Sequence, residues 1–191
     1  ESSDQEGSDR QRAPFCYPAE ISHGFSFNLL KKKPDYLFLP QLKGVYVESG
    51  NKKSITCPLS QGEPYYLSSA FKDLETFRNL KAGGRIMMPV IDFSEGYESA
   101  ENAFVSMAKK LGCRKKVARG AFFEAIKIQK TIEQEKRDAG IHFLHELEKD
   151  PGRSAVVIFG RAYNAFVPEA NMGIPHKLES RVVPVIPFDF L

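Results

Sequence analysis

The stretch Asp35-Tyr36-Leu37-Phe38-Leu39-Pro40 is a short apolar run that predicts a buried strand. It lies between two cysteines that each follow an apolar run, in Phe15-Cys16-Tyr17-Pro18 and in Ile55-Thr56-Cys57-Pro58. This placement predicts two loops that converge at one edge of a sheet, where open α/β sheets usually build their sites. The placement therefore favours the hypothesis that Cys16 and Cys57 bind a metal or an iron–sulfur cluster. The alternative is that both are buried structural thiols.

Short apolar runs alternate with amphipathic segments along the rest of the chain. We expect further strands at 85–91, 155–159 and 182–186, and helices at 19–33, 62–80, 99–111, 117–148 and 175–181. The second of these helices is expected to form mainly after Pro64, and Gly140 is the candidate point of interruption in the longest one. The segment 43–54, rich in Gly and Lys, predicts a loop or short hairpin. The alternation predicts an α/β fold with Rossmann-like parallel sheets flanked by helices.

The pair Gly83-Gly84 is the best candidate boundary between two subdomains. Residues 1–13 are polar and charged and predict a disordered segment or linker. Residues 14–82 are then a first α/β subdomain that carries both Cys16 and Cys57, and 83–191 are a second one whose completeness is left open. Because the chain opens at a predicted site loop and stops just after a strand, we expect a fragment of a longer protein.

The composition excludes several classes of function. The 191 residues carry 27 Lys and Arg against 24 Asp and Glu, a net charge of +3 that does not argue for nucleic acid. No apolar run approaches the roughly 20 residues that a membrane-spanning helix needs. Three cysteines without a secretion signal favour a reducing cytoplasm over a disulfide scaffold. We therefore expect a cytoplasmic protein with no nucleic-acid or membrane partner.

Basic runs occur at three places in the sequence: Lys31-Lys32-Lys33, Lys109-Lys110 and Arg114-Lys115-Lys116. Each run lies at or near the end of a predicted helix, where cations complement the helix dipole. A solvated face is favoured here over a role in contacting phosphate or CoA.

The segment Gly160-Arg161-Ala162-Tyr163-Asn164 directly follows a predicted buried strand. Backbone amides of such a loop, together with Arg161, could cradle a phosphate or an acyl-CoA. Gly160, Arg161, Tyr163 and Asn164 are therefore candidate cofactor-binding residues, with a tight turn and a paired Arg161 as the alternative. For His23, a surface or partly buried position on the helix is favoured over a role in a site. For Asp92, a helix cap or a hydrogen bond within the loop is likewise favoured over a role in a site.

The order of several short motifs resembles the DUF2229 region of CoA-substrate-specific enzyme activases. These large proteins look like fusions of activator ATPase modules with a part related to 2-hydroxyacyl-CoA dehydratase subunits. The resemblance covers most of residues 14–191 and rests on the following motifs: Cys16-Tyr17-Pro18-Ala19, His23-Gly24, Asp35 to Pro40, Cys57-Pro58, Gly160 to Asn164, Ile174-Pro175-His176-Lys177-Leu178 and Val185-Ile186-Pro187-Phe188-Asp189.

The resemblance implies an anaerobic, reductive electron-transfer system. In the related dehydratase and double-cubane proteins, cysteines of Rossmann-like domains hold an iron–sulfur cluster, and an activator hydrolyses ATP to drive an electron into it. By position, Cys16 and Cys57 match cluster ligands, and a third cysteine ligand is expected beyond Leu191 or is absent. The implied partners are an activator ATPase module of the same or another chain and an acyl-CoA substrate. A metal-free docking module within the large activase, or an acyl-CoA or phosphate-binding module, is the alternative.

Overall fold

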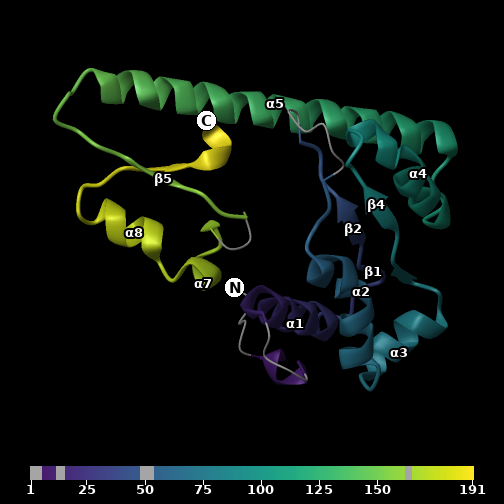
Figure 1. Ribbon diagram of the computed structural model, residues 1–191. Coiled ribbons are helices and arrows are strands. Elements are labelled where there is room, and N and C mark those ends of the chain that lie inside the picture. Colours follow the sequence, from purple (N-terminus) through teal and green to yellow (C-terminus); the bar gives the residue numbers. More distant parts are fainter. Residues whose placement is uncertain (1–5, 12–15, 48–53, 162–164) are drawn as a thin grey trace. The chain divides into compact units, whose positions relative to one another are not determined.

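The chain folds into helices and short parallel strand pairs, as expected for an α/β protein (Figure 1). The computed structural model describes residues 6–11, 16–47, 54–161 and 165–191. The chain divides into two compact units, Glu1–Ile126 and Lys127–Leu191. Within the described residues, none of the helices is both long enough and apolar enough to cross a membrane.

The first unit is built on two parallel strand pairs: β1 (Leu37–Phe38) with β3 (Ile86–Met87), and β2 (Gln41–Gly44) with β4 (Val90–Asp92). Backbone amides of Leu39 and Gln41 donate to the carbonyls of Met87 and Pro89, each over 2.9 Å, and so continue the ladder between the pairs. Strands from both sides of Gly83-Gly84 therefore pair with each other. The glycine pair lies inside this unit, and the two units divide between Ile126 and Lys127.

The helices of the first unit are α1 (Tyr17–Lys31), α2 (Pro58–Phe71), α3 (Glu75–Ala82) and α4 (Glu101–Lys110), with the short 3-10 helices η1 (Ser8–Arg10) and η2 (Tyr97–Ala100). Helix α5 (Lys115–Glu148) contributes residues to both units.

Several boundaries differ from the sequence expectation, and the helix expected at 62–80 is two helices, α2 and α3, with residues 72–74 between them. Helix α2 begins at Pro58, because a proline at the first helical position costs no hydrogen bond. The helix therefore starts before Pro64, which lies in its interior. Strand β2 ends at Gly44, so it reaches into the segment 43–54 that predicted a loop. A side chain at Gly44 would meet the Asp92 carboxylate, 2.6 Å from an added Cβ, which explains glycine at this point of the strand.

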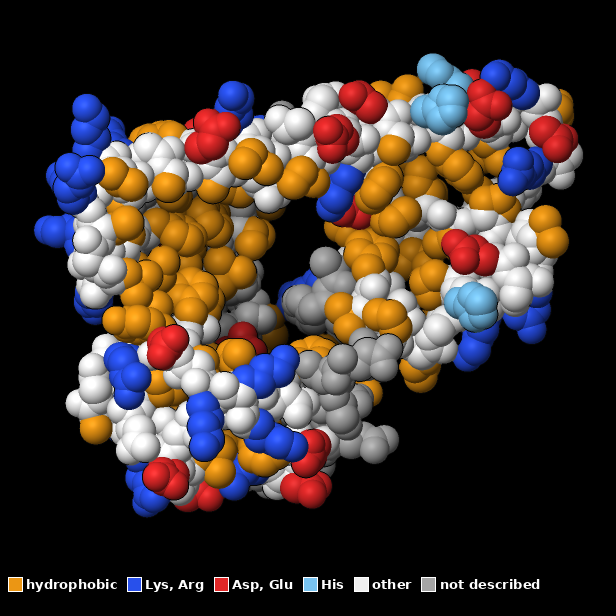
Figure 2. Space-filling view, turned by 180° about the vertical axis from the view of Figure 1, so that it is seen from behind, with side chains coloured by type: hydrophobic (Ala, Val, Ile, Leu, Met, Phe, Trp, Pro, Cys, Tyr) orange, Lys and Arg blue, Asp and Glu red, His pale blue; other side chains and the backbone are white. Residues whose placement is uncertain are grey.

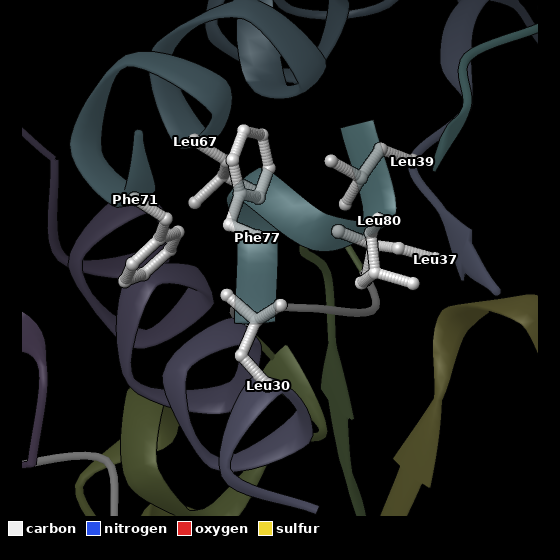
Figure 3. Packing of buried hydrophobic residues seen from close by; sticks show 7 residues of the cluster. All are labelled: Leu30, Leu37, Leu39, Leu67, Phe71, Phe77 and Leu80. Atoms are coloured by element: carbon white, nitrogen blue, oxygen red, sulfur yellow. The ribbon is translucent and has the colours of Figure 1, made fainter. Parts of the chain in front are cut away.

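The main core of the first unit lies between α1, α2, α3 and β1. Its seven buried residues converge from these elements and the residue that follows β1, as Figure 3 shows: Leu30, Leu37, Leu39, Leu67, Phe71, Phe77 and Leu80. Fully burying one such side chain contributes about 1.5–3 kcal/mol. This cluster fixes α1 and α2 against each other and thereby positions the residues at their N-terminal ends.

A second, smaller cluster packs β4 against η2 and the start of α5. It consists of Ile91, Ala100, Phe122 and Ile126, and the ring of Phe104 lies 5.4 Å from that of Phe122. This cluster holds α4 and the first turns of α5 to the strand ladder.

Residues 6–11, part of the segment that predicts disorder or a linker, pack against helices α1 and α2 of the first unit, to which they belong. The Arg10 guanidinium donates to the Ala70 carbonyl over 3.0 Å and pairs with Asp73 over 2.7 Å. Its carbon atom Cζ also lies 5.7 Å from the ring centres of Phe27 and Phe71. Arg10 thus joins this segment to α1 and to the C-terminal end of α2.

The second unit contains the parallel pair β5 (Val156–Ile158) and β6 (Val185–Pro187), with α7 (Pro168–Asn171), α8 (Ile174–Glu179) and the 3-10 helix η3 (Phe188–Phe190). The last strand begins later than the predicted residue 182, because Val182 has φ 61° and closes a turn. Helix α5 runs through Gly140 without interruption. An added Cβ at Gly140 would lie 1.7 Å from the Phe190 carbonyl oxygen, so glycine is needed there for the close approach of η3.

Candidate functional site

Cys16 and Cys57 occupy equivalent places in the fold. Each is the N-cap residue of a helix, Cys16 of α1 and Cys57 of α2, and each helix has a proline at its first or second position. Their carbonyls accept the first bonds of these helices, from Glu20 over 3.1 Å and from Gln61 over 3.0 Å. Both thiols are half-buried. The Cys-Pro pattern in the sequence therefore marks two helix starts.

Thr56 fixes Cys57 beside the carboxyl end of β2. The Thr56 amide donates to the Lys43 carbonyl over 3.0 Å, and its hydroxyl donates to the Leu42 carbonyl over 2.5 Å. The Gln61 side chain in turn donates to the Thr56 carbonyl over 2.9 Å. Three bonds thus determine where the backbone turns from the strand ladder into α2, and Cys57 lies at this turn.

The hydroxyl of Tyr66 on α2 lies within electrostatic reach of both thiols. Burial raises the pKa of Tyr66 to about 12, and negative charge on Glu63, Cys16 and Cys57 acts in the same direction. A hydrogen bond with Ser22 opposes this shift only in part; the two hydroxyl oxygens are 3.4 Å apart. The structure therefore places Cys16 and Cys57 in the electrostatic surroundings of one hydroxyl group, that of Tyr66.

His23 and Glu63 complete the polar surroundings of Tyr66. His23 is only 3% exposed, and its Nδ1 lies 2.7 Å from the Ala19 carbonyl, so Nδ1 carries a proton there. Burial raises the pKa of Glu63, while a hydrogen bond with Ser22 and the charge of His23 lower it again to a smaller extent. We call Ser22, His23, Glu63 and Tyr66 the polar niche.

Sequence reasoning missed most of this niche. His23 was expected at a surface or partly buried position, whereas it is buried. Glu63 and Tyr66 are three residues apart on α2 and hence on the same face of the helix, a spacing that could have pointed to them.

The described residues do not form a complete metal site. Among them, no group of three or more His, Cys, Asp or Glu side chains is arranged to hold an ion. Cys113 is exposed in the turn after α4. The thiols of Cys16 and Cys57 suit a thiophilic centre in ligand type, because thiolates are soft anionic donors. In ligand number they supply half of the four that such a cluster takes.

The Gly160–Asn164 segment is described only in part, because Tyr163 and Asn164 lie outside the described residues. Gly160 follows β5, and an added Cβ there would lie 2.9 Å from the Ala165 side chain. Arg161 is exposed, and its carbonyl accepts from the Ala165 amide over 2.8 Å. The described residues Gly160 and Arg161 thus lie just beyond the carboxyl end of a parallel strand.

Asp92 makes a loop hydrogen bond, as the sequence favoured. Its carboxylate accepts from the Ser94 amide over 3.0 Å and pairs with Lys43 over 3.2 Å. The hydrogen bonds to Ser94, with a smaller contribution from Lys43, lower the pKa of Asp92 to about 2. Asp92 closes the turn after β4.

Fold and site together define an α/β chain in which two cysteines at helix N-caps accompany a polar niche on the same helix pair. The family model described as CoA enzyme activase uncharacterised domain (DUF2229) matches residues 3–191, and the chain belongs to this family. The comparisons with curated proteins and with solved structures gave no match.

Proposed function

We propose that this chain supplies Cys16 and Cys57 as two thiolate ligands of an iron–sulfur cluster in a larger reductive electron-transfer protein. The observation that carries the proposal is the position of the two cysteines at the N-caps of two helices that pack against each other, α1 and α2. Membership of a family described as a CoA enzyme activase domain supports it. The remaining ligands come from another part of the protein or from a partner chain.

The positions of the thiols suit this role in two ways. A thiolate at a helix N-terminus faces the positive end of the helix dipole, which favours negative charge. The hydroxyl group of Tyr66 lies within electrostatic reach of both thiols, and hydrogen bonds to sulfur are one of the means by which proteins tune the potential of a cluster. When bound, the cluster would supply one-electron chemistry. The chain's own residues would bind it and restrict access of water to it.

The partner in this proposal is an activator ATPase module, in the same or another chain, that delivers the electron. The substrate is an acyl-CoA, and the setting is an anaerobic cytoplasm. These parts of the proposal follow from the family resemblance.

The test is reconstitution of the chain with ferrous iron and sulfide under anaerobic conditions, with iron and sulfide counted per chain. We expect Cys16→Ser and Cys57→Ser each to lose most of the bound iron and sulfide. Cys113→Ser is the matched control, because Cys113 is the exposed thiol and lies apart from the α1 and α2 starts, so it should bind as the unchanged chain does. If the Cys16→Ser/Cys57→Ser double variant bound normal amounts, the ligand assignment would be wrong.

Thiol alkylation of the native chain separates this proposal from a metal-free docking module. Vacant ligands at a helix start should react with iodoacetamide, whereas thiols packed for structural reasons should resist it. Cys113 serves as the internal reference for an exposed thiol. Reaction of Cys113 alone would favour the docking module.

A second candidate function is phosphate or acyl-CoA binding at Gly160, Arg161, Tyr163 and Asn164. The observation in its favour is the position of Gly160 and exposed Arg161 directly after β5, at the carboxyl end of a parallel strand. Titration with CoA, compared between the unchanged chain and Arg161→Ala, tests this function. Equal affinity in both would contradict it.

A further inference from the structure

A groove lies between the β3–β4 connection and helix α4 in the first unit. It has a volume of about 250 Å³, and its lining includes Met87, Met88, Val90, Ala103, Met107 and Lys110. Three of the four methionines of the chain line it. We call this feature the methionine groove.

The methionine groove is open to solvent although most of its lining is apolar. Met88 is 37% exposed and Val90 is 53% exposed. The residues from α4 lie at spacings of three, four and seven along the helix, so they form one face of it. Methionine is unbranched and flexible, and it is used at surfaces that adapt to the side chains of a partner. The groove therefore has the chemistry of a surface that receives apolar side chains.

Positive charge gathers beside this groove. Residues 109–118 contain no Asp or Glu, and their five cations are all exposed: Lys109, Lys110, Arg114, Lys115 and Lys116. Figure 2 shows Lys and Arg side chains around the end of α5 that begins the helix, at the left edge of the view. We call residues 109–116 the basic turn.

Three of the five cations of the basic turn lie where the helix dipole opposes them. Lys109 and Lys110 end α4, where cations are favourable, but Arg114, Lys115 and Lys116 lie at the start of α5. Cations at a helix N-terminus are electrostatically unfavourable. The sequence interpretation that all of these runs complement helix ends is therefore wrong for Arg114-Lys115-Lys116. A nearby anionic partner would offset this unfavourable charge.

We propose that the methionine groove and the basic turn together dock an acidic amphipathic helix of a partner protein. The apolar face of that helix would insert side chains between Met88, Val90 and Met107, and its carboxylates would meet the basic turn. The cations extend over eight residues, which suits carboxylates spaced along a helix better than one compact phosphate group. The groove is also smaller than the roughly 300–1,000 Å³ typical of small-molecule pockets. The proposal does not depend on a cluster at Cys16 and Cys57.

The test uses the chain labelled with ¹³C at its methionine methyl groups. The titrant is a synthetic amphipathic helix with leucine on one face and glutamate on the other. We expect the signals of Met88 and Met107 to shift on titration. The signal of Met172, which lies in the second unit and is 74% exposed, should stay in place and is the internal control. A peptide of the same composition in scrambled order should shift neither group.

Two variants test the two halves of the surface. Met88→Lys should abolish binding, with Met172→Lys as the matched control at another exposed methionine. The double change Lys115→Glu/Lys116→Glu should weaken binding roughly tenfold at low salt, and added salt should remove most of that difference. The methyl spectrum itself reports whether each variant is folded.

Three outcomes would overturn the proposal. In the first, the ordered peptide leaves the groove signals unmoved; in the second, the scrambled peptide moves them equally. Alternatively, octanoyl-CoA could shift Met88 and Met107 while the peptide does not, which would make the groove an acyl-chain site.

Discussion

The imidazole of His23 stacks on the phenol ring of Tyr66, with ring centres 5.2 Å apart and planes inclined by 14°. His23 belongs to α1 and Tyr66 to α2, so the stack joins the two helices whose first residues follow Cys16 and Cys57. The ring of Phe71 lies 6.2 Å from His23 and connects the stack to the main core. The polar niche therefore rests on the core that fixes the two thiol-bearing helix starts.

Tyr66 should ionise at a higher pH than an ordinary tyrosine. Its pKa is raised to about 12, chiefly by burial, against about 10 for an unfolded tyrosine. A raised folded pKa means that stability is fully present below pH 10 and is lost as the pH rises from about 10 through about 12. A phenolate absorbance titration should show a late step that Tyr66→Phe removes. Tyr65→Phe, a change at the exposed neighbour, should leave that step intact; its loss there would contradict the assignment.

In Glu63→Gln, the free energy of unfolding should depend less on pH at values above the range in which an ordinary glutamate ionises. Burial raises the pKa of Glu63, so the folded state holds its proton more tightly than the unfolded state. The free energy of unfolding should therefore fall as the pH rises from about 4.5 through the higher folded pKa. Glutamine keeps the shape and a hydrogen-bonding group without the charge, and the fall should become smaller.

Urea unfolding followed by circular dichroism between pH 4 and pH 7.5 measures this effect of Glu63→Gln. Glu135→Gln on the exposed surface of α5 is the matched control and should keep the pH dependence of the unchanged chain. Identical curves for Glu63→Gln and the unchanged chain would show that Glu63 is not held in a buried environment.

The sequence predicted the elements of the fold better than their ends. The apolar run at 36–39 gave β1 and the apolar spacing after Pro18 gave α1, because burial of an apolar pattern decides both. The predicted start of α2 was wrong because Pro64 was taken as the proline that begins the helix, whereas Pro58 begins it. Gly140 suggested a break, although its reason is the approach of Phe190, a contact 50 residues away that no local pattern reveals.

The candidate site was predicted in part, and the difference has a physical cause. A proline one or two residues after each cysteine is a local signal, and both cysteines lie at helix starts as a local signal can indicate. The niche of Ser22, His23, Glu63 and Tyr66 forms only when α1 packs on α2. His23 in particular looks like an ordinary helix residue until the stack with Tyr66 buries it.

Phe77→Ala should destabilise the first unit strongly. Phe77 is 2% exposed and belongs to the main core with Leu30 and Leu67 (Figure 3). Removing a buried phenylalanine side chain leaves a cavity and typically costs about 3–5 kcal/mol of the free energy of unfolding. Ile55→Ala is the control, because Ile55 is 72% exposed and its loss should change stability by about 0.5 kcal/mol or less. Similar urea midpoints for the two variants would contradict the placement of the core.

Two glycines of α5 should respond in opposite directions to the same substitution. At Gly140 an added Cβ would lie 1.7 Å from the Phe190 carbonyl oxygen, and backbone cannot rotate away as a flexible side chain can. Gly140→Ala should therefore displace η3, weaken the Lys136–Asp189 pair that spans 2.9 Å, and destabilise the second unit by about 1–3 kcal/mol. At Gly120 no atom lies within 4 Å of an added Cβ, so Gly120→Ala should stabilise the helix by about 0.5–1 kcal/mol. Hydrogen exchange at residues 188–190, read together with urea unfolding, measures both effects: faster exchange is expected only in Gly140→Ala. Stabilisation by both substitutions would mean that η3 does not pack against α5 at Gly140.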